Sequence, residues 1–116
     1  MIGTTGVLLN NQGGVNLILT ITNDSFSPQV FEGELFFFDS SGNKVGAAHS
    51  VLSVPAQRFV GLQFDITGQV FYELQVSVSS TDVVVNTFSV NASGSIAAQR
   101  VLNTELSPIS ALTPIP

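Results

Sequence analysis

The chain has 116 residues, of which 44% are hydrophobic and only 9% charged, and its formal net charge is −5. This length fits one domain with one hydrophobic core. Three basic residues cannot form the cationic face that nucleic-acid binding requires, and no apolar run reaches the roughly 18 residues of a membrane span. The absence of cysteine excludes disulfides and thiolate metal sites.

The N-terminal residues combine an apolar segment with a flexible connection. Ile2, Val7, Leu8 and Leu9 supply the apolar side chains, and Asn10–Gly14 follows them. No basic region precedes an apolar run, so we expect no Sec-type signal peptide in this chain. Residues 1–14 are interpreted as an N-terminal arm and hinge, since glycine adopts any backbone geometry with little strain. The alternative is that residues 2–9 form the first strand of the domain's own sheet.

Alternation with period two runs through residues 15–106 and predicts a β-strand domain. Residues 15–22 form a first strand, and residues 23–25 turn the chain. Pro28 opens a long strand that ends at Phe38. One face of that strand carries Val30, Glu32, Glu34, Phe36 and Phe38, and the other carries Phe31, Gly33, Leu35 and Phe37. We therefore expect the face with the carboxylates to pass from wet to buried along the strand.

The second half continues the pattern. Residues 39–44 favour a hairpin turn, residues 45–54 form a weaker strand ended by Pro55, and residues 83–90 and 96–106 form the last two strands. The inward-facing side chains of the strands between them are Val60, Leu62, Phe64 and Ile66, then Tyr72, Leu74, Val76 and Val78. Turn signals about every ten residues without a helix are typical of a sandwich. The predicted fold is an all-β, antiparallel β-sandwich, either jelly-roll or immunoglobulin-like, with extended terminal arms.

The C-terminal residues 107–116 alternate apolar residues with polar residues or proline. Proline lacks the N–H group that a central strand needs, so this tail is predicted to be an edge strand or an extended arm. Its apolar side chains are Ile109, Leu112 and Ile115. Together with Ile2, Val7, Leu8 and Leu9 they are the candidate subunit-interface residues.

Catalytic and metal-binding residues are scarce. His49 is the only histidine, and it is interpreted as a solvated side chain on a strand surface. Glu32 and Glu34 are neighbours on one strand face, too local to flank a substrate as a glycosidase requires. Arg100 and Glu105 are candidates for a buried or interface ion pair, and the favoured interpretation is a weak surface pair. We expect no enzymatic activity, no metal and no cofactor.

Four segments carry a resemblance to a known group of proteins. They are Val54–Phe59, Phe64–Gly68, Tyr72–Val76 and Gln99–Leu106, and they resemble the small β-sandwich proteins of spore-forming Firmicutes, among them the endospore-appendage subunits. The resemblance implies a jelly-roll subunit joined to its neighbour by an N-terminal connector arm. The chain departs from that group in lacking the cysteines that cross-link such fibres.

These observations favour a structural subunit of an extracellular or spore-surface filament that polymerises with itself by strand addition. Few charges and apolar termini suit a surface that meets protein, although an extracellular β domain also has a surface rich in Ser, Thr and Asn. Besides further copies of the chain, an anchoring or surface protein is a candidate partner. The alternative function is an adhesive or carbohydrate-binding module, which the absence of Trp and the single Tyr disfavour.

Overall fold

The computed structural model describes residues 1–115, with the backbone alone at residues 97 and 98. It contains ten strands and one short 3-10 helix, η1 (Asn103–Glu105). The strands are β1 (Ile2–Thr4), β2 (Leu8–Leu9), β3 (Asn16–Asn23), β4 (Gln29–Phe38), β5 (Lys44–Val54), β6 (Arg58–Asp65), β7 (Phe71–Val78), β8 (Val83–Asn91), β9 (Gly94–Val101) and β10 (Ser107–Pro108). In this part of the chain no helix is long and apolar enough to cross a membrane.

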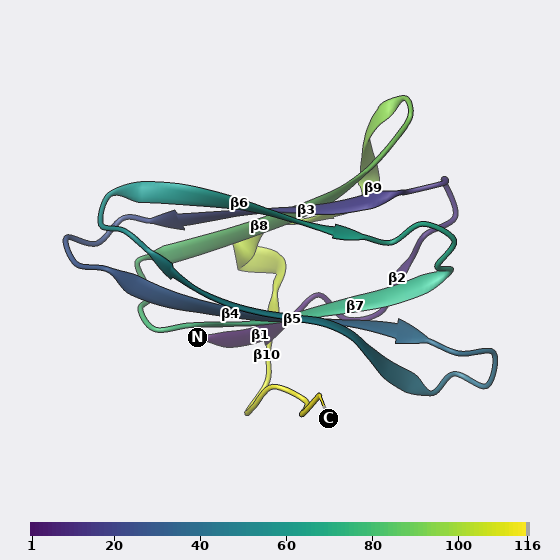
Figure 1. The fold of residues 1–116 in the computed structure, drawn as a ribbon, viewed down its shortest axis with the longest axis horizontal. Helices are drawn as coiled ribbons and strands as arrows, with labels where there is room; N and C mark the ends of the chain where they lie inside the picture. Colours follow the sequence, from purple (N-terminus) through teal and green to yellow (C-terminus); the bar gives the residue numbers. More distant parts are fainter. Residues whose placement is uncertain (116) are drawn as a thin grey trace.

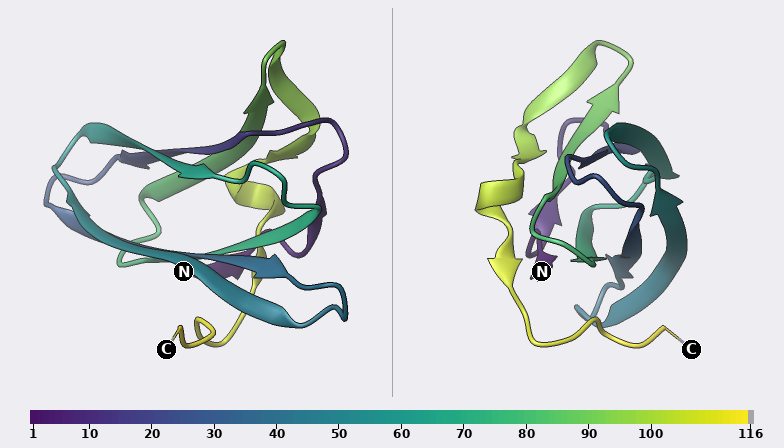
Figure 2. Two further views of the ribbon diagram at one scale, coloured as in Figure 1. Left: turned by 45° about the vertical axis from the view of Figure 1, so that its right-hand side comes forward. Right: turned by 90° about the vertical axis from the view of Figure 1, so that its left-hand side faces the viewer.

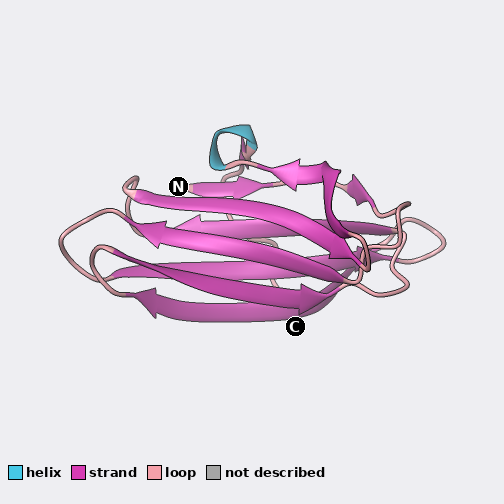
Figure 3. Ribbon diagram, turned by 90° about the horizontal axis from the view of Figure 1, so that it is seen from above, coloured by secondary structure: helices cyan, strands magenta, loops and turns pink. Residues whose placement is uncertain are grey.

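The strands form two antiparallel sheets that pack face to face, which confirms the predicted β-sandwich (Figure 1). The larger sheet has the order β10-β1-β7-β4-β5, with β2 also paired to β7, and the smaller sheet has the order β6-β3-β8-β9. Seen from above, the long strands of both sheets run in nearly the same direction (Figure 3). The packing is therefore of the aligned kind.

From β3 to β7 the chain follows the immunoglobulin-like alternative. β3 pairs with β6 in one sheet, β4 pairs with β7 in the other, and β4 and β5 form a hairpin. An immunoglobulin domain would then place its last strand beside β7. Here β8 instead crosses back to pair with β3, and β1 and β2 occupy the position beside β7. The fold therefore departs from that alternative after β7.

The core lies between the sheets and follows the predicted alternation. On β3 and β7 every second side chain points inward, and Leu74 is fully buried. The buried core residues are Leu17, Leu19, Ile21, Phe31, Leu35, Val54, Ile66, Tyr72, Leu74, Val76, Val78, Val83 and Val85. Phe64, expected in the core, is only partly buried because β6 is an edge strand.

A polar link crosses the core. The hydroxyl of Tyr72 on β7 donates to Oε1 of Gln99 on β9 (2.8 Å), which also accepts from the hydroxyl of Ser89 (2.7 Å). Gln99 Nε2 in turn donates to Oδ1 of Asn10 (3.2 Å). Burial raises the pKa of the Tyr72 phenol, and the nearby Ser89 side chain offsets this rise only in part. Tyr72 of the larger sheet is thereby hydrogen-bonded to Gln99 of the smaller sheet in an apolar interior.

Two local features refine the predictions from sequence. The turn at residues 39–44 forms as predicted: Asp39 accepts backbone N–H groups from Ser41 and Asn43, and the hydrogen bond from Asn43 is the main cause that lowers the pKa of Asp39. The expected strand 96–106, in contrast, is wrong beyond Val101. Glu105 accepts the N–H of Leu102 (2.8 Å), and this contact closes η1.

Candidate functional site

The N-terminal segment lies within its own sheet and is not a free arm. Gly3 is paired with Val76 of β7 on one side and with Pro108 of β10 on the other. The connection after it is closed, since Asn10 Nδ2 donates to the carbonyl oxygens of Gly14 and Gln69, both at 3.0 Å. The interpretation of residues 1–14 as arm and hinge is therefore corrected to the alternative, a strand of the domain's own sheet.

The four N-terminal interface candidates have different environments. Leu8 packs against the core, and Ile2 is half-buried. Val7 and Leu9 are exposed by 56% and 44%, so only these two present a large apolar surface to solvent. They lie on either side of Leu8, which packs against the core of its own domain.

The C-terminal tail folds back over the outer face of the larger sheet (Figure 2). After β10, Thr113 donates its N–H to Oε1 of Gln75 on β7 (2.7 Å) and accepts from Gln75 Nε2 (3.0 Å). Ile115 reaches Gly46 of β5, where a Cβ atom would lie 2.9 Å from Ile115 Cγ2. The three apolar residues of the tail, Ile109, Leu112 and Ile115, are all half-buried within the monomer.

The tail and the edge of the sheet cover Phe36. Phe36 is 2% exposed although it points away from the core, and its neighbours there include Thr113 and Ile115. This face of β4 was expected to pass from exposed to buried along the strand. It does so because the C-terminal tail covers Phe36. A bulge at Ala47 of β5 accompanies it, because Leu35 pairs with Ala48 while Phe36 pairs with Gly46.

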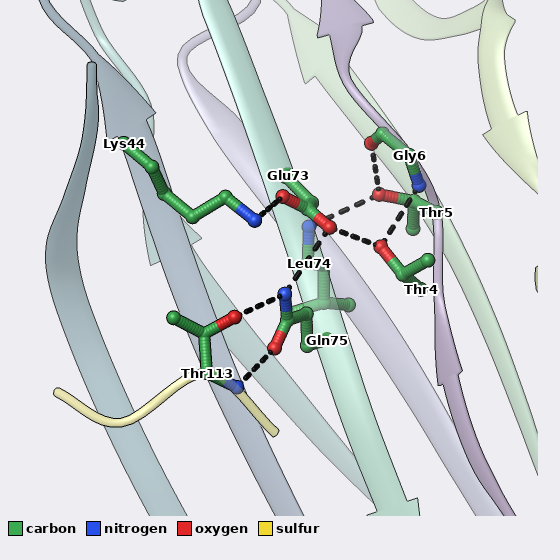
Figure 4. Close-up of polar contacts among 8 residues, drawn as sticks. All are labelled: Thr4, Thr5, Gly6, Lys44, Glu73, Leu74, Gln75 and Thr113. Atoms are coloured by element: carbon green, nitrogen blue, oxygen red, sulfur yellow. Dashed lines mark hydrogen bonds and ion pairs between the residues drawn. The ribbon is translucent and has the colours of Figure 1, made fainter. Parts of the chain in front are cut away.

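A buried carboxylate lies next to Phe36. Glu73 of β7 is 6% exposed, its Oε1 lies 2.7 Å from Lys44 Nζ, and its Oε2 accepts from Gln75 (3.2 Å) and from the Thr4 hydroxyl (Figure 4). Burial opposes ionisation of Glu73, but the hydrogen bonds from Lys44, Thr4 and Gln75 outweigh it and hold the pKa below its usual value.

This cluster was not predicted from the sequence. The one feature that points to the cluster is the polar character of residues 73 and 75, which lie on the same face of the sheet as the apolar Phe36 of the neighbouring strand.

Glu32, Glu34 and His49 form a second polar cluster on the same face. His49 lies opposite Glu34 in the pairing of β4 with β5, and its Nε2 lies 2.6 Å from Oε2 of Glu32 and 4.0 Å from Oε1 of Glu34. One ligand atom from each residue lies within 4.8 Å of the others, so the three could hold a metal ion. His49 is a strand-surface residue with its side chain 44% exposed. The sequence places Glu32 and Glu34 on one strand face, but it does not give the register of β5 that brings His49 beside them.

Arg100 and Glu105 do not form the expected pair in the part of the chain that the structure describes. Glu105 accepts the backbone N–H of Leu102, and Arg100 lies on β9 beside Phe88. The ion pairs of the described residues gather instead on the outer face of the larger sheet.

The two sheets end in edge strands of different character. β5 carries a bulge, a device that discourages pairing with another chain. β6 is paired with β3 without a register shift over all eight residues, and its only charged residues, Arg58 and Asp65, stand at its two ends. Phe59 on β6 is 67% exposed. β6 is thus an edge with regular pairing and weak protection.

Comparisons with known proteins leave this geometry as the basis for inference: no family model, no curated protein and no solved structure matches the chain.

Proposed function

We propose that this protein is a structural subunit of an extracellular or spore-surface filament, in which copies of the chain join by strand addition. The observation that carries the proposal is the weakly protected edge of β6. An exposed strand edge offers a row of unpaired N–H and C=O groups that another strand can bind. The low charge of the chain supports the same function, because few like charges oppose contact between copies.

The smaller sheet also offers a way for the contact to repeat. Its end strands, β6 and β9, run antiparallel to each other, since each neighbouring pair in the order β6-β3-β8-β9 is antiparallel. Edge β6 of one copy could therefore pair with residues 94–96 of edge β9 of the next, the part of β9 that keeps a continuous register with β8, and continue an antiparallel sheet. Such a contact joins two different surfaces, does not close, and builds a fibre. In this version the added strand is an edge of the sandwich and no longer the N-terminal arm.

Electron microscopy and light scattering of the purified full chain test the proposal. We expect filaments at high protein concentration, and we expect the double variant Gly61→Lys/Gln63→Lys to remain monomeric, because lysine on an edge strand opposes strand addition. The matched control is Ser40→Lys/Ser41→Lys in the β4–β5 turn, which changes the net charge equally. Dispersed monomers of the natural chain at all concentrations, or filaments of the β6 variant equal to those of the control, would overturn the proposal.

Among the described residues no exposed Tyr or Trp side chain offers a surface on which a sugar ring could stack. The adhesive or carbohydrate-binding alternative therefore gains no support from such a surface. Tyr72 is fully buried with its hydroxyl bound to Gln99. Specific binding of a monomer on a glycan array would favour this alternative over the filament.

A further inference from the structure

Three side chains from two neighbouring strands converge on the outer face of the larger sheet. Glu32 and Glu34 stand two residues apart on β4, so they share a face, and His49 lies directly across from Glu34 on β5. The side chains of Glu32 and His49 are 37% and 44% exposed, whereas that of Glu34 is 7% exposed. The cluster therefore has a buried floor and an open side.

One of the two carboxylate oxygens of Glu34 at this floor lacks a partner. Its Oε2 is buried and has no hydrogen-bond partner among the described residues. Desolvation by burial is the main cause that raises the pKa of Glu34; the charge of Glu32 raises it further, while His49 lowers it. A buried carboxylate oxygen without a donor costs free energy that a cation in contact would offset.

The cations of the chain do not supply this contact. Lys44, on the same face, is bound to Glu73 at 2.7 Å. Arg58 and Arg100 belong to β6 and β9 of the other sheet. The outer face of the larger sheet therefore carries three glutamates, at 32, 34 and 73, against one lysine and one histidine.

We propose that Glu32, Glu34 and Nε2 of His49 bind one divalent transition-metal ion of the Zn²⁺ class. Imidazole nitrogen and carboxylate oxygen are ligands that Zn²⁺ accepts, at about 2.0–2.2 Å, so the ligand atoms of a tetrahedral site lie about 3.4 Å apart. The distances from His49 Nε2, 2.6 Å to Glu32 and 4.0 Å to Glu34, fall on either side of that value. Small side-chain rotations would equalise them, and the open side leaves a fourth position for water.

Calorimetry of the full chain with Zn²⁺ alone tests this site. We expect one ion per chain and a loss of affinity of about tenfold or more for Glu34→Gln, which keeps the shape of the side chain but removes the anionic ligand. Asp82→Asn, an exposed acid on the β7–β8 turn, is the control with the same change of charge and should bind as the natural chain does. Thermal melting of each variant, with and without Zn²⁺, shows whether it is folded, and Zn²⁺ should raise the melting temperature only where it binds.

Nuclear magnetic resonance gives a second readout, which identifies the ring nitrogen that binds the ion and needs no comparison of affinities. His49 is the only histidine, so its ring nitrogens are assigned without ambiguity. Zn²⁺ should shift the resonance of Nε2 far more than that of Nδ1. Binding through Nδ1, equal affinity of Glu34→Gln and Asp82→Asn, or no Zn²⁺ binding to the folded natural chain would each overturn the proposal.

Discussion

Lys44 reaches across an entire strand to meet Glu73. Lys44 is on β5 and Glu73 on β7, with β4 between them, and Nζ lies 2.7 Å from Oε1 of Glu73. The ammonium group of Lys44 lies over the Phe36 ring, 5.3 Å from the ring centroid. The lysine stem thereby covers apolar surface while its charge is paired, and three strands of the larger sheet are linked by one contact.

The first prediction concerns the pH dependence of stability. The pKa of Glu73 is below its ordinary value of 4.5 in the folded chain, so its ionised form stabilises the fold above that pH, and this contribution is lost as the pH falls through the folded pKa. Glu73→Gln should lower the free energy of unfolding by about 1–3 kcal/mol at neutral pH. The difference from the natural chain should shrink below about pH 4.5. Urea unfolding at a series of pH values measures it.

Lys44→Met provides the complementary variant, because it removes the cation and leaves the glutamate. It should also be less stable at neutral pH and should lose its deficit on acidification. Glu34 has a raised pKa and the opposite pH dependence, but it is present in all three proteins and cancels in the comparison. A deficit that stays constant from pH 7 to pH 3 would contradict the role assigned to Glu73.

The second prediction concerns the C-terminal tail. A Cβ atom at Gly46 would lie 2.9 Å from Ile115 Cγ2, so Gly46→Ala should displace the tail, because the tail can move more easily than the sheet. The amide of Thr113, bound to Gln75 at 2.7 Å, should then exchange its hydrogen faster. Gly61→Ala is the control, because no atom lies within 4 Å of its Cβ. It should leave Thr113 unchanged and raise stability by about 0.4–1 kcal/mol.

The third prediction concerns the core. Leu74 is fully buried at the centre of β7, and Leu74→Ala should lower the free energy of unfolding by about 2–5 kcal/mol through lost burial and a cavity. Val51→Ala, on a side chain that is 59% exposed, should change it by less than about 0.5 kcal/mol. Equal effects of the two substitutions in denaturant unfolding would show that the register of β7 is wrong.

The fourth prediction concerns the N-terminal strands. Deletion of residues 2–9 removes β1 and β2 from beside β7 and takes away the Thr4 hydrogen bond to Glu73. The melting temperature should fall by about 5 °C or more. Val7→Ser and Leu9→Ser, which change only exposed side chains, should melt close to the natural chain. A deletion variant that melts unchanged would restore the interpretation of this segment as a free arm.

Local alternation sufficed to predict the inner faces of the sheets. Leu17, Leu19 and Ile21, and then Tyr72, Leu74 and Val76, are buried as their spacing predicts. Period-two patterns follow directly from strand geometry, so each strand carries its own evidence. The turns could be predicted for the same reason, since Asp39 and Gly42 act on their immediate neighbours.

The outer face of the larger sheet could not be predicted in this way. Whether Phe36 is covered depends on a tail that begins some 70 residues later, and whether Glu34 meets His49 depends on a register set by the bulge at Ala47. The placement of the N-terminal segment could not be predicted either, because an arm and a strand of the domain's own sheet both require apolar residues. Only its partner, Val76 of β7, distinguishes them.

The bond between Tyr72 and Gln99 gives this chain a built-in optical probe. The sequence has one tyrosine and no tryptophan, so tyrosine emission arises from a single position, the point where β7 of one sheet is tied to β9 of the other. Emission should therefore respond when the sheets come apart or when edge strand β9 detaches, and it should be insensitive to fraying at the other long edges, β5 and β6. The step in which the two layers dock during folding can be timed in the natural chain without any label.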